Sequence, residues 1–294
     1  MTLPSNSGEA RQSHPPTPPT IASASSTKAA GIERIARAFQ LAKEESRAAL
    51  MPYTMAGYPD QESSLAVAAA YADSGADLVE LGVPFSDPLA DGPTIHAAAT
   101  EALAEGATLG TALEVCESIA DRVPVVLMAY ANMILACGAT EFAGRAGDAG
   151  AAGAIVPDLP LDESDEIREA LAEVGLALVP LLAPTTPAER RERICAAAEG
   201  FVYVVSTVGT TGERRELPPG LTGLIAAAKE AAEVPVAVGF GIGTPEQVGE
   251  VGEVADGVIV GSRLVRAAGE AGSPRAAADA VGGFLRDSLA ALSD

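Results

Sequence analysis

The chain has 294 residues and a formal net charge of −21, an acidic balance that excludes nucleic acid and anionic membranes as its main partners. Its length fits one α/β barrel of about 250 residues with extra segments, a size at which the core needs neither disulfides nor a structural metal. Its three cysteines lack metal-ligand spacing, so we expect free thiols in a reducing cytoplasm.

Residues 1–30 are rich in Ser, Thr, Pro and Ala and lack the apolar stretch of a secretory signal, so we interpret them as a disordered leader. Apolar residues from Ile32 to Phe39 then repeat at helical spacing and predict an extra N-terminal helix. The sequence contains no run of about 18 apolar residues, so we expect no membrane span. We therefore expect one catalytic domain over residues 31–294.

After this helix, strand-like apolar segments alternate with amphipathic helices eight times. Near-continuous apolar strands with helical connections indicate a parallel sheet covered on both faces. Eight such units predict a (β/α)8 TIM barrel, with a doubly wound sheet as the alternative. The predicted strands are residues 50–57, 78–84, 124–131, 153–160, 176–184, 200–206, 235–242 and 256–264.

The second predicted strand and its loop, LVELGVPFSDPLADGP, contain the first candidate site residues. Glu80 interrupts an apolar run, and a charge in a dry strand costs roughly several kcal/mol unless it is paired or neutralised. Asp91 follows on a loop stiffened by prolines. Two carboxyl groups in such different surroundings can hold different protonation states and divide acid and base work. A solvated structural role for Asp91 remains an alternative.

Glycines follow the seventh and eighth predicted strands, where barrels of this class commonly bind phosphate. Glycine lets backbone N–H groups approach an anion, and the N-terminus of a following helix favours negative charge. Tight turns are the alternative explanation. The phosphate-site candidates are Gly241, Gly261 and Ser262, with Thr211 and Gly212 on the loop after the sixth strand.

Other polar residues carry weaker signals. Tyr203 could donate to a substrate or pack in the core, Asp158 fits a turn, and His96 fits a helix surface. The three lysines fall in the leader or in predicted helices, which argues against Schiff-base chemistry from a barrel strand. The pattern favours a phosphorylated substrate and carboxyl acid–base chemistry without a metal or an organic cofactor.

The segment ELGVPFSDPLADGPTIHAA resembles the hallmark of the tryptophan synthase alpha subunit family. PYTMAGYPD, YANMI, VPDLP, VSTVGTTGER, VGFGI and VGSRLV extend the resemblance, in the expected order, over residues 32–292. The resemblance implies retro-aldol cleavage of indole-3-glycerol phosphate to indole and glyceraldehyde 3-phosphate. It implies that Glu80 transfers the proton to the indole C3 and that Asp91 binds the indole N–H.

The resemblance also implies the remaining contacts of the substrate. It places Tyr203 near the substrate and Tyr53 where a phenylalanine often lines the indole pocket, a departure that could alter the polarity of the pocket. The residues that it assigns to the loop and phosphate contacts are Thr211, Gly212, Gly241, Gly261 and Ser262.

The same resemblance implies a partner. Members of the family work with a beta subunit, which holds pyridoxal phosphate, in a tetramer of two alpha and two beta chains; this chain itself needs no cofactor. The loop of residues 84–93 and the loop with Thr211 would close over the substrate and signal to that partner. Asp87 is our candidate for a loop or partner contact rather than for chemistry.

Two other classes compete with this interpretation. Indole-glycerol-phosphate synthase requires a lysine on a strand, and phosphoribosylanthranilate isomerase requires a cysteine at the end of the first strand; the sequence offers neither. A non-catalytic subunit that only activates a partner is the third possibility, although the presence of both Glu80 and Asp91 weighs against it.

The acidic excess predicts a halophilic adaptation. Lysine is scarce relative to arginine and the acidic residues are spread over predicted helical faces, a pattern typical of proteins from salt-rich cytoplasm, where screening reduces self-repulsion. We therefore expect the thermal stability and the activity to rise with KCl from low to molar concentration. Values that stay constant across such a series would contradict the prediction.

Overall fold

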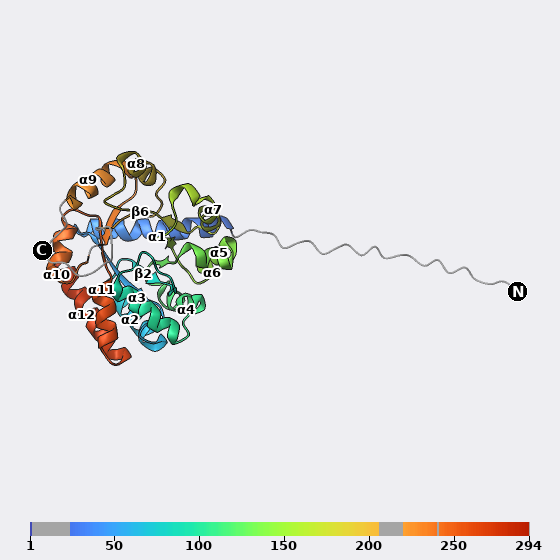
Figure 1. The fold of residues 1–294 in the computed structure, drawn as a ribbon, viewed down its shortest axis with the longest axis horizontal. Coiled ribbons are helices and arrows are strands. Elements are labelled where there is room, and N and C mark those ends of the chain that lie inside the picture. Colours follow the sequence, from blue (N-terminus) through green and yellow to red (C-terminus); the bar gives the residue numbers. More distant parts are fainter. Residues whose placement is uncertain (2–23, 206–219, 240, 294) are drawn as a thin grey trace.

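The computed structural model describes residues 1, 24–205, 220–239 and 241–293 (Figure 1). Its strands form one parallel sheet in the order β5-β4-β3-β2-β1-β9-β8-β7-β6. β5 and β6 stand at the two ends of this order, yet they follow each other directly in the chain as two parts of one barrel strand. The sheet therefore closes into a barrel, and helices surround it. The predicted TIM barrel is thereby confirmed.

The observed strands are shorter than the predicted ones. They are β1 Ala49–Met55, β2 Val79–Gly82, β3 Val125–Met128, β4 Gly153–Ile155, β5 Ala177–Val179, β6 Leu181–Leu182, β7 Val202–Val205, β8 Val236–Gly239 and β9 Gly257–Val260. The fifth predicted strand is divided at Pro180, which has no N–H to donate to the sheet. The Pro180 carbonyl still accepts a hydrogen bond from the Tyr203 N–H, at 3.0 Å.

The helices are α1 Ala24–Glu44, α2 Gln61–Asp73, α3 Pro93–Ala104, α4 Leu109–Ile119, α5 Ala131–Cys137, α6 Ala139–Asp148, α7 Asp165–Glu173, α8 Ala188–Ala196, α9 Leu221–Ala231, α10 Pro245–Gly252, α11 Ser262–Glu270 and α12 Pro274–Ser293, with a 3-10 turn η1 at Leu161–Glu163. α1 begins inside the segment predicted as leader, and α5 was not predicted. No helix within the described ranges is long and apolar enough to cross a membrane.

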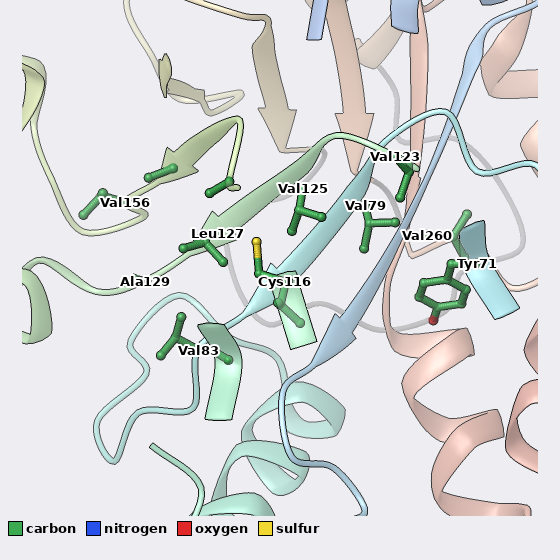
Figure 2. Close-up of a cluster of buried hydrophobic side chains, with 14 of the residues drawn as sticks. Tyr71, Val79, Val83, Cys116, Val123, Val125, Leu127, Ala129, Val156 and Val260 are labelled. Carbon is green, nitrogen blue, oxygen red and sulfur yellow. The ribbon is translucent and has the colours of Figure 1, made fainter. Parts of the chain in front are cut away.

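Side chains along each strand alternate between two faces. Val79, the first residue of β2, belongs to the large cluster between the sheet and the helices, whereas Leu78, just before it, belongs to the cluster inside the barrel. Figure 2 shows part of the outer cluster, where Val79 and Val125 lie near Cys116 of α4. Since side chains two positions apart share a face, Glu80 projects into the barrel with Leu78.

Helix α1 supplies apolar residues to the barrel interior. Ile35 and Phe39 belong to the interior cluster, and the Phe39 ring lies 5.6 Å from the ring of Phe201 at the start of β7. The guanidinium of Arg34, on the same helix, donates to the carbonyls of Gly150 (2.9 Å) and Val123 (3.2 Å). Buried apolar residues therefore fill this interior from α1 up to the level of Glu80.

An ion pair joins the segment just before β1 to the segment just before β2. The guanidinium of Arg47 donates to both oxygens of Asp77, one of them at 2.9 Å, and the Leu50 N–H donates to the same carboxylate at 2.8 Å. Both charged side chains are nearly buried, with 9% and 10% exposure. The hydrogen bonds to Asp77 raise the pKa of Arg47, so the pair stays charged.

We predict that Asp77→Ala lowers the free energy of unfolding by about 3 kcal/mol, because it removes the buried partner of the nearly buried Arg47 guanidinium and leaves it only the exposed Glu45 carboxylate. The control is Asp73→Ala, which breaks an exposed pair with Arg122 and should cost at most about 1 kcal/mol. Urea unfolding measures both variants. Equal losses in the two would contradict the prediction.

Candidate active site

A cavity of about 130 Å³ opens at the carboxyl ends of the strands. This is the end of a barrel at which active sites form, because the loops after the strands converge there. The cavity brings together most of the residues expected from the sequence. Its wall consists of Tyr53, Glu80, Ala90, Asp91, Ile95, Met128, Pro157, Leu181, Tyr203, Val205, Gly239, Gly241, Ile242, Ile259, Gly261 and Ser262.

Glu80 lies at the bottom of this cavity. It is 1% exposed, and neither carboxyl oxygen has a hydrogen-bond partner among the described residues. Burial, with a smaller contribution from the nearby Asp91 charge, raises the pKa of Glu80 to about 8. At neutral pH the group is therefore mostly a carboxylic acid that carries a proton into an apolar cavity.

Asp91 reaches the same cavity from the loop between β2 and α3. Burial raises its pKa to about 6, while the Tyr130 hydroxyl and the charge of His96 act in the opposite direction. Asp91 is thus mostly ionised at neutral pH, whereas Glu80 is mostly neutral. The two carboxyl groups hold different protonation states, as the sequence predicted.

Two tyrosines line the cavity, and each lies against a glycine of the neighbouring strand. A side chain at Gly82 would collide with the hydroxyl of Tyr53, and one at Gly239 with that of Tyr203. Burial raises the pKa of both phenols well above its usual range, so both stay neutral. Tyr203 packs in the interior cluster, as one of its two predicted alternatives states, and it also lines the cavity; donation to a substrate stays a prediction.

Gly239, Gly241, Gly261 and Ser262 meet on one side of the cavity. Ser262 is the first residue of α11. The N–H groups of Leu264 and Val265 donate to the Gly261 carbonyl, which leaves those of Ser262 and Arg263, among the described residues, for an anion. The predicted residues Thr211 and Gly212 lie outside the described part of the chain. The three described members of the predicted phosphate site, Gly241, Gly261 and Ser262, thus line the same cavity as the carboxyl pair.

The remaining polar candidates do not line the cavity. His96 is exposed on α3, and Asp87 is exposed on the β2–α3 loop, where it accepts from the Ser86 hydroxyl at 2.6 Å. Asp158 is exposed after β4 and accepts from the Ala131 N–H, at 2.8 Å, so it binds the start of α5 rather than only shaping a turn.

One residue of the site was missed. Tyr130 lies at the end of β3 and contacts Asp91, yet its sequence segment YANMI was noted only as a family motif. The rule that barrel sites form at strand ends could have identified it.

In the part of the chain that the structure describes, no group of His, Cys, Asp and Glu could hold a metal ion. The cysteines are free thiols, buried at 116 and 195 and partly exposed at 137.

Comparison with known proteins gives consistent results. A family model described as "Tryptophan synthase alpha chain" matches residues 39–286. A protein of that name from Synechococcus sp. (strain CC9902) is 47% identical over 249 residues, which cover 84% of this chain and 93% of the relative. One from Carboxydothermus hydrogenoformans is 46% identical, covering 80% of this chain and 88% of the relative.

Solved structures agree in fold. A chain of Mycobacterium tuberculosis tryptophan synthase superimposes with a TM-score of 0.82 at 35% identity, covering 89% of this chain and 98% of that chain. A tryptophan synthase alpha chain from Legionella pneumophila superimposes with a TM-score of 0.79 at 35% identity, covering 88% of this chain and 97% of that chain.

The raised pKa of Glu80 predicts how stability depends on pH. The folded state holds the Glu80 proton up to about pH 8, whereas an unfolded glutamate releases it near pH 4.3. The stabilisation from this proton is complete below about pH 4.3 and is lost as pH rises to about 8. We expect Glu80→Gln to gain stability over wild type across this window, by up to about 1.4 kcal/mol per pH unit.

Urea unfolding between about pH 5 and pH 9 measures this difference. Asp87→Asn is the matched control, because it removes an exposed carboxyl from the loop that follows β2. It should leave the pH dependence of wild type unchanged. A constant difference between wild type and Glu80→Gln across the series would contradict a buried, protonated Glu80.

Proposed function

The chain belongs to the tryptophan synthase alpha chain family, a family of carbon–carbon lyases, and we propose that Glu80 and Asp91 carry out its cleavage of indole-3-glycerol phosphate. One observation supports this assignment above the others. A neutral carboxyl group, without a hydrogen-bond partner among the described residues, and an ionised one face the same apolar cavity, next to a cluster of glycines at a helix N-terminus.

The first step needs an acid, because the bond between indole C3 and the glycerol chain breaks only after C3 is protonated. Glu80 supplies that proton, and the ring becomes an indolenine that can accept the bonding electrons. Asp91 accepts a hydrogen bond from the ring N–H and stabilises the positive charge that develops there. The dry cavity strengthens this interaction, since water does not screen it.

The second step needs a base. The hydroxyl group on the carbon next to C3 must lose its proton as the carbon–carbon bond breaks, so that an aldehyde forms and the electrons return to the ring. The Glu80 carboxylate produced in the first step accepts that proton and regains its starting state. Protons and electrons then balance without a metal or cofactor, and the products are indole and glyceraldehyde 3-phosphate.

The substrate phosphate binds Gly241, Gly261 and Ser262. Glycine leaves the backbone N–H groups open to an anion, and the positive end of the α11 dipole lies at Ser262. Thr211 and Gly212 remain predicted members of this site. Tyr53 and the apolar residues of the cavity then hold the indole ring.

A tryptophan synthase beta subunit is the proposed partner. Support comes from two large apolar side chains near the mouth of the barrel, Leu89 on the β2–α3 loop (90% exposed) and Leu135 on α5 (52% exposed). The Mycobacterium tuberculosis relative is a tryptophan synthase. Binding there would cover the cavity mouth, pass indole to the partner for tryptophan synthesis and place Asp87 at the interface.

Two further statements, on the cellular compartment and on salt adaptation, remain predictions. The three free thiols fit a reducing cytoplasm, which is where we place the reaction. The halophilic adaptation stays a prediction from composition, because neither the fold nor the relatives support it.

Lys43 and Lys229 lie on helices α1 and α9 rather than on strands, which weighs against the competing barrel class that requires a lysine on a strand.

We predict that Glu80→Gln lowers the rate of indole release from indole-3-glycerol phosphate by about 10²–10⁴-fold, because the amide cannot donate a proton to carbon. The fold should persist, since glutamine fills the same space; circular dichroism checks this. The assay is run with and without a beta subunit. Normal turnover in the variant would remove Glu80 from the mechanism, and a wild-type chain that never releases indole would indicate a non-catalytic subunit.

A further inference from the structure

Tyr130 is a buried tyrosine that the chemistry above does not use. It is 3% exposed and lies between the end of β3 and the first residue of α5. Its ring stacks on Phe85, with centroids 5.2 Å apart and planes at 26°. Its hydroxyl accepts a hydrogen bond from the Ala90 N–H at 3.1 Å. Tyr130 therefore contacts the β2–α3 loop near its start and again next to Asp91.

The same hydroxyl interacts with the Asp91 carboxylate. A phenol has one proton to donate and lone pairs that accept. Because the Ala90 N–H occupies an acceptor site, the proton remains available to Asp91, and this interaction lowers the pKa of that carboxyl. One oxygen atom thus binds the backbone of the loop and its catalytic side chain together.

Tyr130 is itself anchored from the next strand. The Asp158 carboxylate, after β4, accepts from the N–H of Ala131, the residue that follows Tyr130, at 2.8 Å. The Tyr130 hydroxyl then connects this anchored point to the loop after β2. The contacts link the ends of three neighbouring strands, and Asp91 is at the end of the series.

We propose that Tyr130 is a positioning residue, which fixes the Asp91 carboxylate toward the indole nitrogen without touching the substrate itself. This inference rests on the proposed role of Asp91. Tyr130 is not part of the cavity wall, which agrees with an indirect role.

Several other groups face Asp91 and remain unchanged when the Tyr130 hydroxyl is removed. They are Tyr53 from β1, Glu80 from β2, Tyr203 from β7 and His96 from α3. Without the hydroxyl, the pKa of Asp91 rises above its value of about 6, because the interaction that favours the carboxylate is lost. A larger fraction of Asp91 is then protonated at neutral pH and cannot accept from the indole N–H.

The test is Tyr130→Phe, which keeps the ring stacked on Phe85 and removes only the hydroxyl. The rate of indole release from indole-3-glycerol phosphate is measured between about pH 5 and pH 9 with the full chain. We expect kcat/KM at neutral pH to fall about 10- to 100-fold, the usual effect of losing a hydrogen bond to a charged group. The acidic limb of the pH profile should also move to higher pH.

Tyr71→Phe is the matched control. It removes another buried tyrosine hydroxyl, which donates to the Tyr53 carbonyl at 3.0 Å from helix α2 outside the barrel. It should lower stability and leave the acidic limb in place. A Tyr130→Phe profile that coincides with that of wild type or of Tyr71→Phe would overturn the proposal. A wild-type chain that releases no indole would instead overturn the proposed function.

Discussion

The site depends on one constraint, the burial of the Glu80 carboxyl group in the dry interior of the barrel. The side chain has no polar partner among the described residues, and α1 with Phe201 keeps the interior below it apolar. An ionised carboxylate would be costly there, so the proton stays on. The fold therefore holds a carboxylic acid at neutral pH in the wall of the cavity at the carboxyl ends of the strands.

The same packing arrangement, a tyrosine on a glycine of the neighbouring strand, occurs twice around Glu80. Tyr53 on β1 lies over Gly82 of β2, and Tyr203 on β7 lies over Gly239 of β8. In each case a strand glycine leaves room for a tyrosine from its neighbour. Both rings line the cavity, in which burial raises the pKa of Glu80 to about 8 and that of Asp91 to about 6. These strand glycines thus provide space, in addition to any role in phosphate binding.

Several features could not be predicted from local sequence. Pro180 divides a strand because it has no N–H to donate to the sheet. Its carbonyl nevertheless accepts a hydrogen bond from Tyr203 of β7, so the chain stays in the barrel wall at this point. The apolar segment after β3 suits a strand as well as a helix, and α5 forms there. Asp158 suggested a turn, but it binds the start of α5 across the space between two strand ends. Each outcome depends on a contact with a distant segment.

The sequence by itself determined the barrel and the family, and it identified Glu80 and Asp91 as the proposed catalytic pair. Alternating apolar strands and helices specify the layers, and a glutamate within an apolar strand is anomalous wherever that strand packs. The tertiary structure decided which groups meet: the register that turns Glu80 inward, the helix that keeps the interior dry, and the Tyr130 hydroxyl beside Asp91. Burial and pairing between residues far apart in the chain set the protonation states, and such contacts exist only after folding.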